Sequence, residues 1–257
     1  MVRSVGQGLS DIGRRRKNNQ DAFLVDDILG LYIVADGMGG HKAGEVASTQ
    51  AITTIRNMIK SGWSDLAGLS QRPPAPGRIP DAVGRRGLRL MESAVQAATY
   101  MICAMADYDP SREGMGTTVS ALLVRGPTAV VAQVGDSRVY RVRGTEVQQL
   151  TEDHTVVAYQ IKNGHITPEQ ARFSPYKNMI TRAVGSNDYV QVDTLLLQAE
   201  PGDRFLLCSD GLHGYLGLDE VLAVMQQEPG SAVQEFVQLA NQRGGRDNIT
   251  ALIVDLD

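Results

Sequence analysis

Short apolar runs separated by turn residues are the feature that most constrains the fold of this chain. Three consecutive runs, at 119–124, 128–134 and 138–142, follow one another through short turns, which predicts a meander of antiparallel strands. All seven runs are rich in residues that favour strands. They are LYIVA (31–35), VSALLV (119–124), TAVVAQV (128–134), RVYRV (138–142), VQVDTLLL (190–197), RFLLC (204–208) and NITALIVDL (248–256).

Amphipathic helix patterns lie between these runs. Apolar residues recur at the helical period over about 43–60 and 88–106, as expected for helices lying on a sheet. A further helix is predicted to begin at Thr167, which can cap it ahead of a proline in the first turn. Two more are expected near 218–227 and 231–243. The chain is therefore predicted to combine many strands with several helices.

One segment breaks this pattern. Residues 71–88 hold four of the ten prolines together with three glycines and four arginines. Such a composition buries too little apolar surface to order itself as a helix or a strand. Because the segment lies between two helix patterns rather than between two complete sets of elements, we expect a surface insertion within a single domain of residues 1–257.

Composition excludes several classes of function. The 25 Lys and Arg residues against 29 Asp and Glu residues give a net charge of −4, which argues against a nucleic-acid binder. No apolar run approaches the ~20 residues that span a bilayer, and the first residues lack the apolar core of a signal peptide. The two cysteines, Cys103 and Cys208, indicate neither a disulfide framework nor a zinc site. We therefore expect a cytoplasmic protein that binds neither nucleic acid nor membrane.

Four aspartates share an unusual placement at the ends of predicted strands. Asp36, Asp136 and Asp210 each follow an apolar run, and Asp247 precedes one. A carboxylate at a strand end is held rigidly and can still face a cleft. Any one of them could instead be ordinary turn chemistry. If the four converge, the ligands are oxygens only, which suits Mg²⁺ or Mn²⁺; convergence itself cannot be read from the spacing.

A run of four cations, Arg14 to Lys17, precedes the polar cluster 18–21 and an apolar strand. Such a run can be a solvated face. It can also carry a guanidinium to the same edge as Asp21, where the planar group matches phosphate oxygens in a two-pronged contact.

These residues resemble a known family, the metal-dependent serine/threonine protein phosphatases of type 2C, in its compact bacterial form. The resemblance covers residues 10–250 and holds in order and in spacing. The matching motifs are SDIGRRRKNNQDA (10–22), IVADGMGGHKAGEVAS (33–48), GMGTT (114–118), VGDSRVYR (134–141), LTEDHT (150–155), LLCSDGL (206–212) and GGRDNIT (244–250).

The resemblance implies an α+β fold, in which a central antiparallel β-sandwich is flanked by helices on both faces. It places residues 155–189 in a flap beside the active site. A flap is where substrate selection is expected.

The resemblance also implies a ligand set. Asp36 would bridge two metal ions, with the Gly37 carbonyl on one ion and Asp210 and Asp247 on the other. Asp136 together with Asp210 would hold a third, weaker ion. The cofactors implied are thus two Mn²⁺ or Mg²⁺ ions, with a third left open.

Other residues take roles around the ions. Asp21 would hold metal-bound water, and Arg16 would bind the phosphate. Gly214 stands where many family members carry an acidic residue, which leaves the third ion in question. GMGTT is expected to serve close strand packing near the site.

The chemistry implied is hydrolysis of phosphoserine and phosphothreonine monoesters. Two divalent ions about 3.5–4 Å apart lower the pKa of a bridging water, so a hydroxide can attack phosphorus without a covalent phosphoenzyme. Arg16 and the ions stabilise the charge on the equatorial oxygens. His41 is a candidate proton donor to the leaving group, although a metal-bound water could do the same and His41 could be structural. The histidines His154 and His165 receive no role.

The expected partners are phosphorylated proteins, the substrates of a serine/threonine kinase, and the chain is expected to be a monomer. Two other classes compete. A pseudophosphatase on the same fold would have lost metal ligands, whereas the four aspartates and Arg16 are all present. An adaptor docking through 71–88 and the cationic run predicts binding without turnover.

Overall fold

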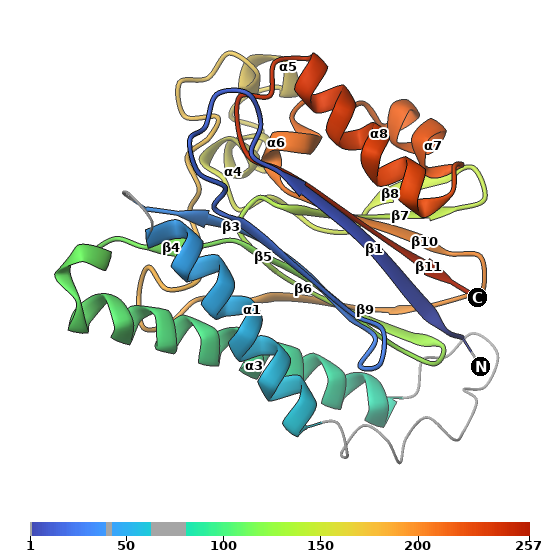
Figure 1. Cartoon of the computed structure of the whole chain (residues 1–257), viewed down its shortest axis with the longest axis horizontal. Coiled ribbons are helices and arrows are strands. Elements are labelled where there is room, and N and C mark those ends of the chain that lie inside the picture. The colour runs from blue at the N-terminus through green and yellow to red at the C-terminus, as the bar shows by residue number, and fades with distance from the viewer. Residues whose placement is uncertain (1, 40–42, 63–80) are drawn as a thin grey trace.

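Two antiparallel sheets packed face to face form the centre of the molecule (Figure 1). The computed structural model describes residues 2–39, 43–62 and 81–257. In spatial order, the first sheet consists of β1 (Ser4–Asp11), β11 (Ile249–Leu256), β10 (Arg204–Cys208), β7 (Arg138–Arg143) and β8 (Glu146–Gln149). The second consists of β2 (Asp21–Asp26), β3 (Leu31–Met38), β5 (Val119–Arg125), β6 (Thr128–Val134) and β9 (Asp193–Gln198), with β4 (Gly116–Thr117) beside β3.

Helices cover the outer face of each sheet, which gives four layers and confirms the expected α+β sandwich. The second sheet is covered by α1 (Ala43–Ser61) and α3 (Asp81–Tyr108). The first is covered by α7 (Leu218–Met225) and α8 (Pro229–Gln242). The short elements η1 (Pro110–Arg112), α4 (Val156–Lys162), α5 (Pro168–Ala171) and α6 (Asp210–His213) lie in the connections. None of the described helices has the length and apolar character needed to cross a membrane.

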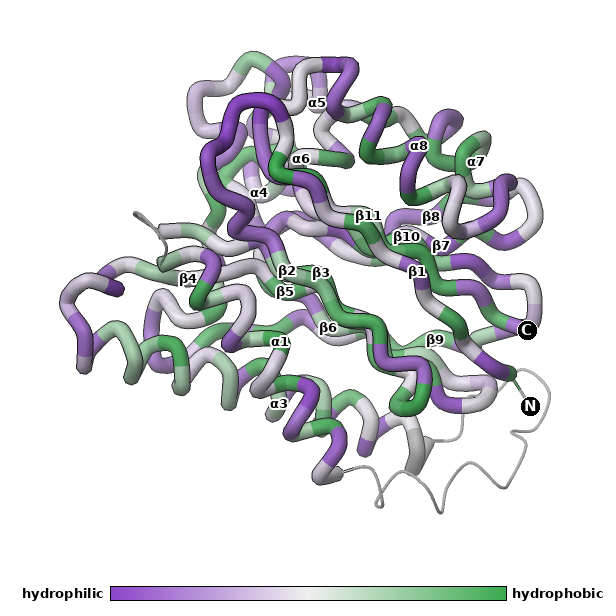
Figure 2. The backbone as a smooth tube through the Cα atoms, viewed as in Figure 1, coloured by the Kyte–Doolittle hydropathy of each residue, from purple (hydrophilic) through white to green (hydrophobic). Residues whose placement is uncertain are grey.

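Strand β3 explains why the central runs are apolar throughout. Leu31, Ile33 and Ala35 belong to the core beneath α1 and α3, whereas Tyr32 and Val34 belong to the core between the two sheets. Alternate side chains of a strand point to opposite faces. A strand buried on both faces therefore loses the polar alternation of a surface strand. Figure 2 shows this hydrophobic character along the central strands, beside a hydrophilic loop between β1 and β2.

The predicted meander is wrong in its last step. Strands β5 and β6 pair as expected, but β7 pairs with β10 and β8 in the other sheet. The chain changes sheets at Gly135, whose φ of +99° a residue with a side chain rarely adopts. A Cβ there would lie 2.6 Å from Thr118 Cγ2. The VGDS segment is thus a crossing between layers rather than a hairpin turn.

The expectation for 71–88 is corrected over its second half. Helix α3 begins at Asp81 rather than near residue 88, so 81–88 are helical. Two glycines allow this, because the helix approaches the sheet closely where they lie. A Cβ on Gly84 would lie 2.2 Å from Leu196 Cδ2, and one on Gly87 3.0 Å from Val130 Cγ2. Residues 71–80 lie outside the described part, and the single domain stays a prediction.

The two ends of the described chain meet at one end of the sandwich. Strands β1 and β11 are antiparallel neighbours. Arg3 and Asp257 exchange two backbone hydrogen bonds of 2.9 Å each. Both ends lie together in Figure 1. Asp247 precedes β11 at the opposite end of that strand.

Candidate active site

The strand-end aspartates come together at one end of the sandwich. Asp21 and Asp36 face each other across β2 and β3. The carboxyl of Asp36 interacts electrostatically with Asp21, Asp210, Asp136 and Asp247. Antiparallel strands from two sheets deliver these residues to one edge, although up to 226 positions, from Asp21 to Asp247, separate them in the chain. The convergence that spacing left open is therefore present.

Asp21 is the most buried of the five and connects the two sheets. Its Oδ2 accepts hydrogen bonds from the hydroxyls of Ser209 (2.7 Å) and Thr250 (2.6 Å). Ser209 follows β10, and Thr250 lies in β11. Burial raises the pKa of Asp21 to about 6, against the effect of the two hydroxyl bonds.

The main chain around Asp36 is fixed by the GMGTT segment. The Asp36 amide donates to Thr118 Oγ1 (2.9 Å), and the Asp36 carbonyl accepts from the Thr118 amide and the Thr117 hydroxyl, both at 2.9 Å. A Cβ on Gly37 would lie 2.0 Å from the Gly44 carbonyl oxygen, so α1 can begin against β3 only because Gly37 lacks one. The segment thus holds Asp36, in addition to pairing with β3.

Asp136 and Asp210 lie on facing turns. Asp210 opens α6, and His213 of the same helix donates from Nε2 to the Asp136 carbonyl at 2.9 Å. This bond requires the proton on Nε2. Burial lowers the pKa of His213 to about 4, which keeps the ring neutral. His213 therefore ties together the turns that carry two of the aspartates, a link that the sequence analysis missed.

Asp247 is the one aspartate of the five with an ion pair in the described structure. Arg16 Nη2 lies 2.5 Å from Asp247 Oδ2. The neighbouring Asn248 is buried and organises the loop that carries Arg16. Its side chain donates to the carbonyls of Ile12 and Asn18 and accepts from the Gln20 amide. Sequence reasoning assigned Asn248 no role; its place in the GGRDNIT motif was the available signal.

The electrostatics of the cluster are those of crowded, unneutralised carboxylates. Burial raises the pKa of Asp136 to about 6 and that of Asp210 to about 7, and neighbouring aspartates add to both effects. The pKa of Asp36 rises well above its ordinary value for the same reasons. Asp21 Oδ1 and Asp210 Oδ1 are buried and accept no hydrogen bond within the described part of the chain. The fold thus concentrates negative charge that a cation would relieve.

The residues fit hard divalent cations by their donor chemistry. All donors are oxygens, which Mg²⁺ and Mn²⁺ prefer. Among the described residues, no group of three or more carboxylates, imidazoles or thiols is arranged so that together they could hold a metal ion. Mg²⁺ commonly binds through one or two carboxylates and keeps several waters. Asp36, Asp210 and Asp247, with the Gly37 carbonyl, are the residues that would hold such ions.

A cavity of about 840 Å³ opens beside the cluster. Asp136, Asp210 and Asp247 contribute to its lining, and Arg172 and Lys177 of the flap line it as well. Gly214, the position that put a third ion in question, is also part of the lining. His41 lies outside the described residues. The predicted flap therefore lies against the aspartates, with two cations on the shared cavity.

Sequence comparisons with known proteins find clear relatives of this chain. The family model "Protein phosphatase 2C" matches residues 10–252. The chain is 33% identical to the serine/threonine phosphatase stp of Listeria monocytogenes over 253 residues, which is 96% of this chain and 94% of that protein. It is 36% identical to the serine/threonine protein phosphatase PstP of Mycobacterium tuberculosis over 248 residues, 96% of this chain but 44% of that longer protein.

Solved structures agree as well. The fold matches the crystal structure of the Mycobacterium tuberculosis phosphatase PstP/Ppp with a TM-score of 0.85 and 34% identity, over the full length of both chains. It also matches the PstP catalytic domain in complex with two manganese ions, with a TM-score of 0.82 and 33% identity over 100% of this chain and 99% of that one. The chain therefore belongs to the protein phosphatase 2C family of serine/threonine phosphatases.

Proposed function

We propose that this chain hydrolyses phosphoserine and phosphothreonine monoesters of proteins, by direct attack of water and without a covalent phosphoenzyme. The observation that carries the proposal is the set of buried, mutually repelling carboxylates beside an open cavity. Family membership supports it, because curated relatives are named serine/threonine phosphatases. The chain spans less than half of the mycobacterial relative, so activity, substrates and partners are proposed here for this chain alone.

Two divalent ions, Mn²⁺ or Mg²⁺, are proposed at Asp36, the Gly37 carbonyl, Asp210 and Asp247, with Asp136 available to a third. When bound, such ions supply Lewis acidity that makes water nucleophilic near neutral pH and neutralises charge on the phosphoryl group. A relative of the family has been solved with two manganese ions, which supports this pair.

The chain's own residues supply binding and placement. Arg16, whose half-exposed side chain lies beside Asp247, carries the guanidinium proposed to hold the phosphate oxygens in two-pronged contacts. Asp21, anchored by two hydroxyls, is proposed to orient water. His41 is proposed to deliver a proton to the leaving serine or threonine oxygen. Arg172 and Lys177 give the flap a cationic surface for the peptide that flanks the phosphoresidue.

A phosphothreonine peptide tests the proposal. Purified protein should release phosphate from it in the presence of Mn²⁺, and excess chelator should abolish the release. Asp210→Asn, which keeps the size of the side chain and removes its charge, should lose most of the activity. Acid-quenched reactions should contain no labelled protein, since no phosphoenzyme forms. Peptide binding without phosphate release would favour an adaptor or a pseudophosphatase instead.

The biological setting follows from the same proposal. Substrates of a serine/threonine kinase are the phosphoproteins expected. Both cysteines are free thiols, Cys208 being buried, which is compatible with a reducing cytoplasm. Location there and a monomeric state stay predictions, which fractionation and light scattering would test.

A further inference from the structure

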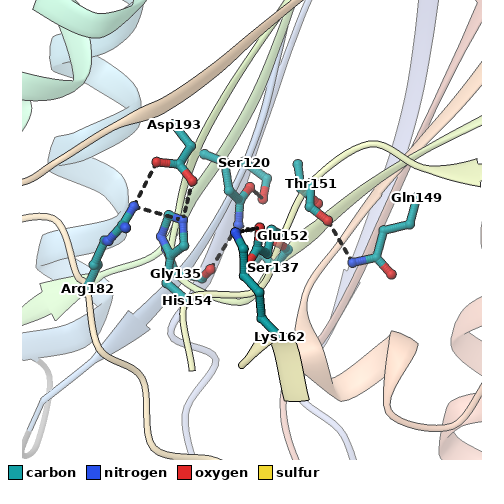
Figure 3. A network of polar contacts seen from close by, with 11 residues as sticks. Ser120, Gly135, Ser137, Gln149, Thr151, Glu152, His154, Lys162, Arg182 and Asp193 are labelled. Atoms are coloured by element: carbon teal, nitrogen blue, oxygen red, sulfur yellow. Dashed lines mark hydrogen bonds and ion pairs between the residues drawn. The ribbon is translucent and has the colours of Figure 1, made fainter. Parts of the chain in front are cut away.

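His154 is a buried member of a network of polar contacts that also includes Gly135, Arg182 and Asp193 (Figure 3). It follows β8 and is only 5% exposed. Its Nδ1 accepts a hydrogen bond from the Gly135 amide at 3.1 Å. A neutral imidazole that accepts at Nδ1 carries its proton on Nε2. Nε2 therefore donates to Asp193 Oδ2, which lies 3.0 Å away. Burial lowers the pKa of His154, which favours this neutral ring.

The first arm of the network holds the turn that carries Asp136. His154 contacts Gly135 twice, because its own amide also donates to the Gly135 carbonyl at 2.9 Å. The buried side chain of Gln133 donates to the Gly135 carbonyl (3.0 Å) and to the Ser137 carbonyl (2.7 Å). Asp136 thus sits in a turn whose main chain is bound on both sides, and His154 provides two of these bonds, one through its ring and one through its amide.

The second arm holds the base of the flap. The carbonyl of His154 accepts from the Thr181 amide at 2.7 Å, and the next residue, Thr155, forms a bridge with Ile180. Arg182 donates to Asp193 Oδ1 at 2.7 Å, so the same carboxylate receives both the imidazole and the guanidinium. The guanidinium Nη1 and the imidazole Nε2 lie 3.2 Å apart, as two donors on one acceptor group. The two ends of the flap therefore close on each other at His154, with α4 and α5 between them.

We propose that His154 is a positioning residue that couples the flap to the Asp136 turn. Nδ1 fixes the turn, while Nε2, through Asp193 and Arg182, fixes the flap. When a substrate contacts the flap, the His154 imidazole then transmits the contact to the turn that positions the Asp136 carboxylate. The proposal rests on the proposed function, because it assigns the flap to substrate and Asp136 to the reaction centre.

Two substitutions separate the arms. The amide oxygen of asparagine can replace Nδ1, whereas the amide of glutamine reaches the position of Nε2. His154→Asn therefore keeps the bond to Gly135 and releases Asp193, and His154→Gln does the reverse. His165, an exposed histidine of the same flap, provides the matched controls His165→Asn and His165→Gln.

Hydrogen exchange of the metal-free protein is the first measurement, and it needs no activity. The Gly135 amide should exchange roughly tenfold faster in His154→Gln, the change expected for loss of one buried hydrogen bond. It should stay protected in His154→Asn. The Thr181 amide, which donates to the His154 carbonyl next to Arg182, should show the opposite order. Equal exchange at Gly135 in the two variants would overturn the assignment of the arms, even if the wild type had no phosphatase activity.

Kinetics then distinguish coupling from a merely structural role. His154→Gln should lower kcat at least ~5-fold for both p-nitrophenyl phosphate and a phosphopeptide. His154→Asn should keep kcat on the small substrate within about twofold and raise KM for the phosphopeptide. Proportional losses on both substrates in both variants would contradict the proposal.

A third variant keeps the test decisive if the His154 variants fail to fold. Asp193→Ala removes a carboxylate whose side chain is 44% exposed and leaves the imidazole in place. It should reproduce the His154→Asn pattern, with phosphopeptide KM raised and p-nitrophenyl phosphate turnover kept. Unchanged KM for the phosphopeptide would overturn the flap arm.

Discussion

At the two ends of the sandwich, the same strands carry buried aspartates in different electrostatic surroundings. Asp203 precedes β10, is fully buried, and accepts hydrogen bonds from Arg143 at 2.6 and 2.7 Å. Asp210 follows the same strand and has no ion pair among the described residues. At the paired end, Arg204 also neutralises Asp255 of β11. At the other end, Asp247 is the one member of the five-aspartate cluster with an ion pair among the described residues, and its partner Arg16 has a half-exposed side chain.

The difference distinguishes two kinds of aspartate. Asp203 and Asp255 are neutralised by arginines of the chain, whereas the aspartates of the cluster lack enough cations to neutralise them. Where an arginine is supplied with the carboxylate, the cost of burial is offset within the chain. Where none is supplied, repulsion and burial raise the pKa values of the carboxyls, and a cation from outside must neutralise them. The paired end is thus expected to control stability, and the unpaired end activity.

The largest expected effect is the loss of activity when the charge of Asp36, in the aspartate cluster, is removed. Asp36→Asn should lower kcat at saturating Mn²⁺ by at least ~100-fold, because a proposed bridging ligand and its charge are lost. The same substitution should raise the thermal stability of the metal-free protein, since one repelling charge is gone. Turnover of p-nitrophenyl phosphate and thermal unfolding measure the two effects. Wild-type activity of the Asp36→Asn protein would show that Asp36 is not a ligand that the reaction requires.

The converse substitution is at the paired end. Arg143→Met leaves Asp203 buried without its cation, which should reduce the free energy of unfolding by about 3 kcal/mol. Its kcat per folded molecule should not change. Arg141→Met on the same strand is the control, because Arg141 forms no ion pair within the described residues, and it should cost less than about 0.5 kcal/mol. Urea denaturation gives both values. A loss of kcat in Arg143→Met would contradict the expectation that this end controls stability and not activity.

A smaller effect is expected at the boundary between the two kinds of acid, where Arg16 pairs with Asp247. Arg16→Ala should lower kcat/KM at least ~10-fold, because charge-assisted bonds to a phosphate are lost. Arg16→Lys should also be impaired, since an ammonium cannot make the planar contact. Arg15→Ala should change kcat/KM less than about threefold. Equal losses at positions 15 and 16, erased by salt, would indicate a diffuse cationic patch instead.

The smallest expected effect is a dependence of the stability of the metal-free protein on pH. The folded-state pKa values of Asp21 and Asp136 are raised to about 6 and that of Asp210 to about 7, whereas unfolded aspartates titrate near 3.8. The folded state therefore binds more protons between these limits, and stability falls as pH rises from about 4 to about 7. Saturating Mn²⁺ should flatten this slope. Melting temperatures across this pH range measure the slope. A stability that rises with pH would contradict the raised pKa values of these aspartates.

The sequence predicts the elements well and the contacts between them less well. Apolar runs identify strands because burial on both faces leaves few polar residues. The route of the chain after β6 was mispredicted, since a short Gly-Asp-Ser turn can serve a hairpin or a change of sheet, and only the conformation of Gly135 decides. The start of α3 was missed because Gly84 and Gly87 indicate a turn in sequence, while in the fold they permit close packing against β9 and β6.

The candidate site shows the same limit. Aspartates at strand ends were identifiable one by one, but their meeting depends on two sheets being stacked. His154 was set aside because nothing in the sequence places Gly135 and Asp193 on either side of one ring. Long-range partners of this kind follow from topology, which a single sequence does not encode locally.

The antiparallel pairing of the first and last strands has a consequence for engineering. Residues 3 and 257 lie side by side at the end of the sandwich that is remote from the cavity. A fluorescent reporter or an affinity tag fused at residue 3 or residue 257 of this chain would start from this point, away from the cavity. The same adjacency would let a short peptide join the two termini, so that new ends could be cut elsewhere and the order of the strands along the gene changed while their arrangement in space is kept.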